Sequence, residues 1–569
     1  MNRSADFLTG KRGMSEATPT GPDAPLSPDD PQRGDELNVA TDAHLDLERA
    51  ILPGKVSAGL ARVLIVAFCS CLAIVPIVQI ALEATGRQRA QLADLVQREP
   101  TRANLHRYEE DVARNSVFKQ AVQPEVQLVL STTTGYGNSK VYIGRDGVLF
   151  YRPGMNFVTG RGILDSGRIR ALRKRLIDAG EQNAEPDPRP AILAFHAACR
   201  SAGVRLVVVP APDKIMLMPE KAGLTLKRGD SASASVTNSD YSRFVAELRE
   251  AGVDVFDPMT AGPWPADKVR YLDQDTHWTP EWMEVVAKEL AEHVRSTGAL
   301  AGGQSVSYVD EPVNVTRVGD LVDMLDLPKN QTLFPPKEVT VRKTLNTKTG
   351  QAWSSEASAD VVLLGDSFAN IYTAPQMGWG ESAGLAPRLS RHLGRPIDAI
   401  TLNGGGASNT RRELARRQEG LSGKRVIIWE FTVRELTDAS WDVIPFGSAA
   451  TPPALKSSGS TLEVEGTLEK VSKVPEPFSS AYPDCVTFTL LKVDRVIEGK
   501  YDDSHMLLVM WAMKNNVWLK AAKYAPGQRL RVKVMPLKQA DNSVRSAQRA
   551  DNTEVYDRAP YFAIEEQAL

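Results

Sequence analysis

The sequence predicts an α/β fold with a mainly parallel sheet flanked by helices, preceded by one transmembrane helix and followed by a small β domain. Three observations support this prediction. A long uncharged apolar run lies near the amino terminus, strand-like and helix-like segments alternate through the middle of the chain, and the carboxyl-terminal part is rich in strand-like segments. Strands that alternate with helices are typical of parallel sheets, whereas consecutive strands are typical of antiparallel sheets and barrels.

Composition and charge exclude some classes of function. The 42% apolar content is enough for a large core. The 68 Lys and Arg residues nearly balance the 70 Asp and Glu residues, so the chain lacks the basic excess of a nucleic-acid-binding protein. The four cysteines have no metal-ligand spacing, and we expect no metal centre and no cofactor. A single disulfide between Cys199 and Cys485 stays open on this evidence.

The amino-terminal part predicts a membrane anchor. Residues 1–60 are rich in Pro, Asp, Ser and Thr and predict a disordered tail. The run Val63 to Leu82 carries no charge and has the length of a bilayer-spanning helix, so we place a transmembrane helix at residues 61–84. Residues 85–134 are polar and helix-compatible and predict a stalk. Lys and Arg residues flank both ends of the run in similar number, so they leave its orientation open.

The alternating pattern places an α/β domain at residues 135–450. It begins with a hairpin at residues 140–154, around the turn signal Asp146-Gly147. We then expect helices at residues 241–251 and 280–297, and strands at residues 205–212, 254–258, 360–365 and 425–431. A Pro-, Ser- and Gly-rich linker at residues 452–460 leads into the predicted β domain at residues 460–569, which has barrel-like strand spacing.

A candidate nucleophile follows one of the predicted strands. The apolar segment VVLL ends in Gly365-Asp366-Ser367, which places the serine at the carboxyl edge of a parallel sheet. Open α/β folds bind their ligands at that edge. Asp and Ser are also favoured at helix N-caps. The local sequence alone favours these two interpretations equally.

A serine nucleophile needs a base, and the base needs a group that orients it. Among seven histidines, three follow an aspartate by two residues: Asp42 and His44, Asp275 and His277, and Asp503 and His505. The first pair lies in the predicted tail and the last in the β domain. His277 lies directly before a predicted helix that Thr279-Pro280 opens, and it is the candidate base with Asp275 as its partner.

A third strand end supplies candidates for binding. The segment LNGGGASNTRREL follows an apolar strand, and Asn403 could donate to an oxyanion, although a glycine-rich turn into a helix explains the same residues. Arg411 and Arg412 could contact an anionic sugar, or be solvated.

These residues resemble the SGNH-hydrolase-like domain of the alginate O-acetyltransferases of the AlgX and AlgJ type. The resemblance covers residues 135 to 440, and its Asp-x-His motif precedes the serine motif. The stretches that carry it occur in the same order as in the family: KVYIGRDGVLFY, VVVPAPDKIMLMPE, GVDVFDP, DTHW, GDSF, and LNGGG through KRVIIWEF.

The resemblance implies an O-acetyltransferase that moves acetyl groups onto exopolysaccharide hydroxyls through an acetyl-serine intermediate. It implies Ser367 as nucleophile, His277 as base and Asp275 as orienting group. It also implies a polysaccharide acceptor, a membrane-bound O-acyltransferase partner as acetyl source, and a single-pass protein of the bacterial inner membrane with its tail cytoplasmic and its catalytic domain periplasmic. An extracytoplasmic acetylesterase with the same triad, and a non-catalytic polysaccharide-binding scaffold, are the alternatives.

The β domain at residues 460–569 does not match the polysaccharide-binding module of that family. We expect it to fold on its own and to contribute nothing to acetyl-enzyme formation, since its one Asp-x-His pair is isolated. If it binds polymer, Trp511, Trp518 and Tyr524 could stack on sugar faces, although core packing explains them as well.

Overall fold

The computed structural model describes most of the chain beyond the predicted tail. The described residues are 57–85, 105, 109, 116–178, 181, 183–224, 235–265, 268–417, 419–446, 461–477 and 482–569. The predicted disordered tail lies almost wholly outside them, as do His44 and much of the predicted stalk. The chain divides into two units, Met1–Gln120 and Ala121–Leu569.

The first unit contains one long apolar helix. Helix α2, Ala58–Ala84, has 27 residues, which corresponds to roughly 40 Å at the rise of an α-helix. Its large apolar side chains are exposed, including Leu64, Ile65 and Phe68. By length and composition it can cross a membrane, in agreement with the predicted segment. Helix α5, Val117–Thr134, lies within the predicted stalk.

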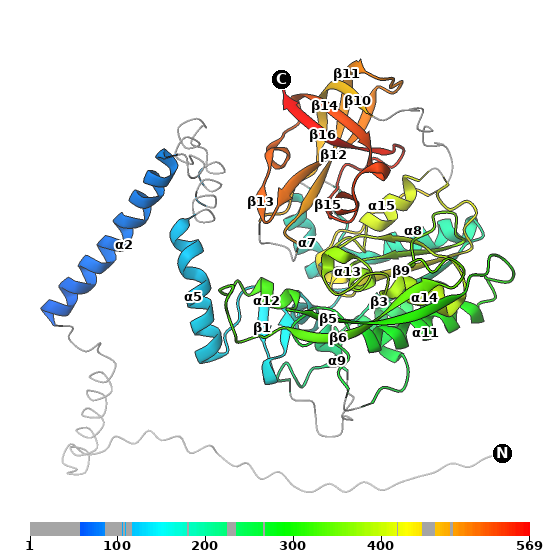
Figure 1. Cartoon of the computed structure of the whole chain (residues 1–569), viewed down its shortest axis with the longest axis horizontal. Helices are drawn as coiled ribbons and strands as arrows, with labels where there is room; N and C mark the ends of the chain where they lie inside the picture. Colours follow the sequence, from blue (N-terminus) through cyan, green and yellow to red (C-terminus); the bar gives the residue numbers. More distant parts are fainter. Residues whose placement is uncertain are drawn as a thin grey trace, which may run out of the picture. The chain divides into compact units, whose positions relative to one another are not determined.

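The second unit is built on a five-stranded parallel sheet with the order β4-β3-β9-β7-β8. Figure 1 labels its strands β3 and β9. Its central strands are continuous apolar runs, as expected for strands buried on both faces. The parallel α/β prediction is confirmed. The strands are β3 Arg205–Ala211, β4 Asp254–Val255, β7 Val361–Gly365, β8 Asp398–Thr401 and β9 Val426–Thr432.

Helices and short segments surround this sheet. Helix α11 begins where predicted, because the Thr279 hydroxyl accepts a hydrogen bond from the Trp282 amide and Pro280 occupies the first turn. The predicted strand at residues 254–258 is shorter than expected, since Pro258 opens a 3-10 turn. The helices are α6 Arg152–Thr159, α7 Ser166–Asp178, α8 Pro188–Ser201, α9 Lys214–Leu217, α10 Tyr241–Glu250, α11 Pro280–Ser296, α12 Asp320–Met324, α13 Ser367–Asn370, α14 Leu385–Leu393, α15 Asn409–Ala415 and α16 Glu435–Asp438.

Two antiparallel hairpins lie outside the main sheet. The predicted hairpin is present as β1, Val141–Ile143, and β2, Leu149–Tyr151. Its turn places Asp146 at a φ of 57° and Gly147 at 74°, a left-handed conformation that Asp and Gly tolerate. The second hairpin joins β5, Tyr308–Arg317, to β6, Lys337–Asn346.

The carboxyl-terminal strands form a closed sheet. Strands β10, β11, β12, β16 and β14 pair in that order, and β14 pairs back to β10. Apolar side chains such as Val464, Leu508 and Val532 fill the interior, so the barrel-like prediction is confirmed. The strands are β10 Leu462–Val471, β11 Cys485–Glu498, β12 His505–Lys514, β13 Val517–Trp518, β14 Arg529–Pro536, β15 Gln548–Ala550 and β16 Pro560–Ala568.

The two cysteines left open by the sequence do not pair. Cys199 lies in the core of the α/β domain and Cys485 in the core of the barrel, and both are free and buried. Burial raises the pKa of each thiol to about 12.

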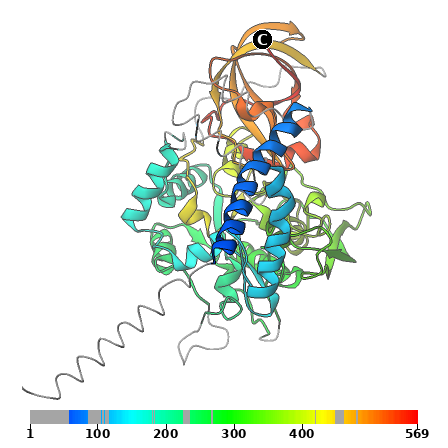
Figure 2. The same ribbon diagram turned by 90° about the vertical axis from the view of Figure 1, so that its left-hand side faces the viewer.

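Buried charges join the barrel to the α/β domain. In Figures 1 and 2 the orange-to-red barrel lies against the side of the domain that carries α15. Arg416, at the end of α15, forms an ion pair of 2.5 Å with Asp551, and the two side chains are only 2% and 1% exposed. Arg549 pairs with Glu413 at 2.6 Å. Since buried charges need their partners, these contacts fix the position of the barrel loop on α15.

This interface generates a stability prediction. Asp551→Ala leaves Arg416 buried without its carboxylate, and we expect a loss of about 3–5 kcal/mol in the free energy of unfolding. Denaturant unfolding of residues 116–569 measures it. Asp557→Ala is the control, because Asp557 is 52% exposed and lies 3.7 Å from Arg558. Equal unfolding midpoints for the two variants would contradict the prediction.

Candidate active site

Ser367 lies at the carboxyl edge of the parallel sheet. Strand β7 ends at Gly365, and Ser367 is the first residue of α13. Asp366 is the N-cap, and its carboxylate accepts from the Phe368 amide at 2.8 Å and from the Thr432 amide at 3.1 Å. The cap interpretation of the Gly-Asp-Ser segment is therefore correct for Asp366. It leaves the serine side chain at the helix start available for chemistry.

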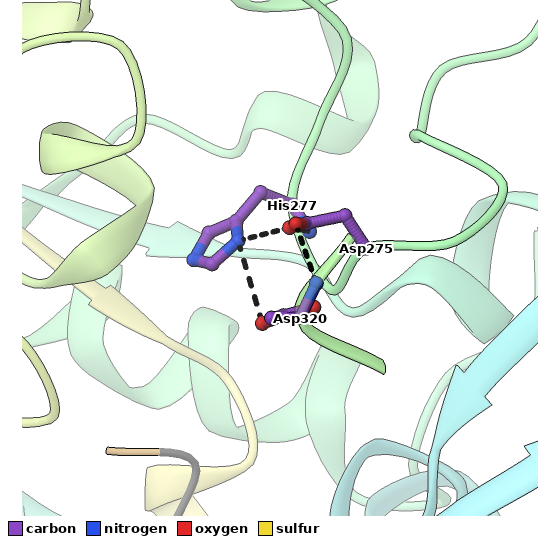
Figure 3. A group of neighbouring side chains, drawn as sticks. All are labelled: Asp275, His277 and Asp320. Atoms are coloured by element: carbon purple, nitrogen blue, oxygen red, sulfur yellow. Dashed lines mark hydrogen bonds and ion pairs between the residues drawn. The ribbon is translucent and has the colours of Figure 1, made fainter. Parts of the chain in front are cut away.

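The loop before α11 holds Asp275 and His277 together. A bridge between Tyr271 and Trp278 closes this loop, and the Leu272 amide donates to the His277 carbonyl at 3.1 Å. The closure places Nδ1 of His277 at 2.6 Å from Oδ1 of Asp275 (Figure 3). Both side chains are buried. This is the contact that the Asp-x-His spacing predicts.

Asp275 is held by further donors. Its Oδ2 accepts from the Asp320 amide at 3.0 Å and from Nε1 of Trp379 at 2.9 Å. Burial disfavours its charged form, but the hydrogen bonds outweigh this effect and hold the pKa of Asp275 below its usual range. Burial likewise lowers the pKa of His277, and the contact with Asp275 reverses this, so that the pKa of His277 is raised.

Asp320 is a site residue that the sequence reasoning missed. Its carboxylate accepts from the amide and the hydroxyl of Thr276, at 2.8 and 2.6 Å, and lies 3.9 Å from Nδ1 of His277. Burial and the neighbouring Asp275 raise the pKa of Asp320. No motif marks it, because it lies at the start of a short helix 45 residues from Asp275.

The three side chains in Figure 3 have the spacing of metal ligands, with candidate atoms within 4.8 Å of one another. Their hydrogen bonds favour another interpretation. Nδ1 of His277 already bonds to Asp275, and protein donors bond to both carboxylates. The donor set therefore fits an oriented histidine better than the ligand shell of an ion.

The residues that follow His277 and Ser367 in the sequence contact each other, and this contact brings His277 and Ser367 close together. Trp278, next to His277, donates from Nε1 to the carbonyl of Phe368, next to Ser367, at 3.1 Å. The His277 and Phe368 rings lie 4.9 Å apart between centroids. Nε2 of His277 points away from the two aspartates (Figure 3) and is buried without a hydrogen-bond partner in the part of the chain that the structure describes. It is thus available to accept a proton.

A cavity of about 440 Å³ opens beside Ser367. Its α/β side includes Tyr151, Thr276 and Arg434. Its other side comes from the barrel and consists of Lys473, Pro475, Tyr482, Gln548, Arg549, Ala550, Asp551 and Asn552. The candidate active site therefore lies between the two domains.

The barrel residue Tyr482 reaches the candidate nucleophile. Tyr482 and Ser367 line the same cavity, and burial raises the pKa of the Tyr482 phenol, which therefore stays neutral. Its ring packs on Gly404, where a Cβ would lie 2.9 Å from the ring and where φ is +66°. That the β domain forms one side of the cavity beside Ser367 could not be read from the sequence.

Two predicted binding residues occupy other positions. Nδ2 of Asn403 contacts Sδ of Met377 at 3.3 Å, its Oδ1 accepts from Asn370 at 2.9 Å, and the residue does not line the cavity. Arg411 is fully buried, donates to the carbonyls of Ala407 and Asp442, and packs on Trp429. These contacts give Arg411 a structural role, which corrects its assignment to substrate.

Acidic residues lie close to the nucleophile. The Asp366 amide donates to Glu430 at 2.9 Å, and burial together with Asp366 raises the pKa of Glu430 well above its usual value. Burial also raises the pKa of Glu435, whose carboxylate accepts from the Ala407 amide at 2.6 Å. Both carboxyls therefore favour the neutral form, which limits negative charge beside Asp366.

The fold and the geometry of the candidate site agree with a known class of protein domain. Residues 172–433 match the family model described as SGNH hydrolase-like domain, acetyltransferase AlgX. This segment is an SGNH hydrolase-like domain. It is similar to the acetyltransferase domains of the AlgX and AlgJ type.

Similar proteins carry related names. The chain is 27% identical over 259 residues to the probable alginate O-acetylase AlgJ of Pseudomonas fluorescens, covering 42% of this chain and 61% of that protein. It is 30% identical over 270 residues to the protein of the same name from Pseudomonas aeruginosa, covering 45% and 65%. The chain thus spans less than two thirds of these curated relatives.

Solved structures of proteins named AlgJ and AlgX are also similar to this chain. The O-acetyltransferase domain of Pseudomonas putida AlgJ aligns with a TM-score of 0.38 and 23% identity, over 53% of this chain and 94% of that one. Pseudomonas aeruginosa AlgX aligns with a TM-score of 0.37 and 17% identity, over 58% and 71%.

The Asp275–His277 contact generates a pH prediction. A base must be neutral, and the pKa of His277 is raised, so cleavage of a small acetyl ester should increase with pH through a midpoint above the usual 6.5. Asp275→Asn removes the interaction that raises this pKa and allows the wrong tautomer. We expect the rate to fall about 10⁴-fold and the midpoint to move to lower pH. An unchanged kcat/KM profile would contradict the assignment of Asp275.

Proposed function

We propose that this protein is an O-acetyltransferase that acts on hydroxyl groups of an exopolysaccharide, with Ser367, His277 and Asp275 as its triad. The observation that carries the proposal is the 2.6 Å contact between Asp275 and Nδ1 of His277, which leaves Nε2 available beside the serine helix. The names of the AlgJ relatives support acetylation of a polysaccharide.

The chemistry has two balanced steps. The Ser367 hydroxyl attacks the donor's acetyl carbonyl while Nε2 of His277 takes its proton, and the donor leaves with that proton as the carbon–oxygen bond to it breaks. A sugar hydroxyl then attacks the acetyl-serine and gives its proton to His277, which returns it to Ser367. Asp275 stabilises the imidazolium in both steps and is not itself protonated.

The donor and the setting follow from the same proposal. A membrane-bound O-acyltransferase partner supplies the acetyl group, and α2 anchors the chain in the bacterial inner membrane. The tail is then cytoplasmic and the catalytic domain periplasmic. The apolar exposed surface of α2 supports anchoring.

Acetyl transfer can be tested with the full chain in detergent, an acetyl-ester donor and oligosaccharides, with mass spectrometry of the sugars. We expect acetylated sugar from the native chain and none from Ser367→Ala, since loss of a triad member commonly costs several orders of magnitude in rate. Ser422→Ala is the control, because this serine lies in an exposed turn away from the cavity. Acetate release without acetylated sugar would indicate an esterase. Sugar binding without either product would indicate a scaffold.

Orientation requires its own test. A reporter fused after Leu569 should be active only if it functions outside the cytoplasm, because α2 places the rest of the chain on the far side of the membrane. A paired fusion before Met1 should show the opposite behaviour. Activity of a strictly cytoplasmic reporter at Leu569 would overturn the proposed topology.

A further inference from the structure

The barrel has the connectivity of an OB-fold. Strands β10, β11 and β12 form an antiparallel meander, β12 then pairs in parallel with β16, and β14 closes the ring between β16 and β10. Barrels of this kind bind oligonucleotides and oligosaccharides with the loop between their first and second strands and the loop between their fourth and fifth. Here the first loop is described at residues 472–477 and 482–484, and the second loop comprises residues 537–559.

Both loops face the cavity beside Ser367. Every barrel residue that lines it belongs to one of them: Lys473, Pro475 and Tyr482 to the first loop, and Gln548, Arg549, Ala550, Asp551 and Asn552 to the second. The part of an OB-fold that usually holds a ligand thus forms one wall of the active-site cavity.

The second loop is held in this position from two sides. Strand β15, Gln548–Ala550, pairs in parallel with the start of β11, directly after the first loop. The Asn552 amide donates to the Ser472 hydroxyl at 3.0 Å, which ties the two loops together. On the other side, Asp551 and Arg549 pair with α15. The second loop, together with the start of the first loop at Ser472, therefore forms a fixed wall.

The wall carries groups that suit a sugar. Tyr482 offers a neutral hydroxyl at Ser367, Gln548 offers an amide, and exposed Lys473 forms no ion pair within the described part of the chain. Arg412, Arg434 and Arg549 also line the cavity, but each is paired with a carboxylate. Aromatic, amide and cationic groups around a polar cavity match the mixed hydroxyl and ring surfaces of a saccharide.

The geometry points to the two barrel loops as the acceptor half of the active site, where an oligosaccharide segment binds and where Tyr482 acts as a catalytic residue at Ser367. This inference rests on the proposed function and adds a location for the acceptor. Trp511 and Tyr524 pack against apolar clusters and Trp518 donates to the Pro475 carbonyl, so these aromatic residues are not part of the proposed site.

Binding can be measured separately from catalysis. Calorimetry on full-length Ser367→Ala in detergent would use two probes, a neutral glucan hexasaccharide and an anionic mannuronate hexasaccharide. We expect at least one to bind, and we expect Lys473→Ala combined with Gln548→Ala to raise its Kd at least tenfold. Lys500→Ala is the matched control, because this exposed lysine follows the second barrel strand and does not line the cavity. If the double variant unfolds, each single variant replaces it.

The role of the Tyr482 hydroxyl can be measured in a separate experiment. Tyr482→Phe keeps the ring on Gly404 and removes only the hydroxyl, so the acetylation burst with a small ester should slow by roughly tenfold while the melting temperature is unchanged. A native burst rate would overturn its catalytic role.

The outcomes separate the two proposals. Failure of both hexasaccharides to bind, or native affinity in the folded loop variants, would overturn the acceptor site while leaving acetyl transfer by the native chain intact. Absence of acetyl transfer by the native chain would instead overturn the proposed function.

Discussion

The site depends on one buried carboxylate. Asp275 bonds to His277 through Oδ1 and accepts from Asp320 and Trp379 through Oδ2, so three segments of the α/β domain meet at two oxygen atoms. A buried charge without partners is strongly destabilising. The fold must therefore bring Trp379 and the start of α12 to this point, and doing so fixes the histidine ring with Nε2 directed away from them.

A second buried carboxylate imposes a related constraint on the segment that carries the candidate nucleophile. Asp366 has to remain where it caps α13, yet Glu430 lies beside it. Two buried negative charges at this distance would repel each other. The raised pKa of Glu430 resolves the conflict, because a neutral Glu430 can accept from the Asp366 amide without that repulsion. Arg434, paired with Asp213 and lying over the Phe368 ring, adds positive charge nearby.

Sequence reasoning succeeded where a local pattern encodes the structure. Gly365-Asp366-Ser367 follows its strand and Asp275-x-His277 precedes its helix, so the contact between the latter two was predictable from spacing. Asp320 and Trp379 were not predictable, since they reach Asp275 from 45 and 104 residues away without a motif. Asn403 and Arg411 failed for a different reason. Their types suit chemistry, but only packing decides that one faces Met377 and the other Trp429.

The linker before the barrel was misleading for a physical reason. Pro, Ser and Gly between two patterns predict that two domains fold separately, but they say nothing of the surfaces that those domains present to each other. The decisive residues lie elsewhere. Arg416 and Asp551 are buried because the barrel covers the end of α15, and in this position Tyr482 lines the cavity beside Ser367. A charge pair that is costly to separate therefore keeps the barrel side of the cavity in place, and it couples the integrity of the barrel to the surroundings of a serine more than a hundred residues earlier in the chain.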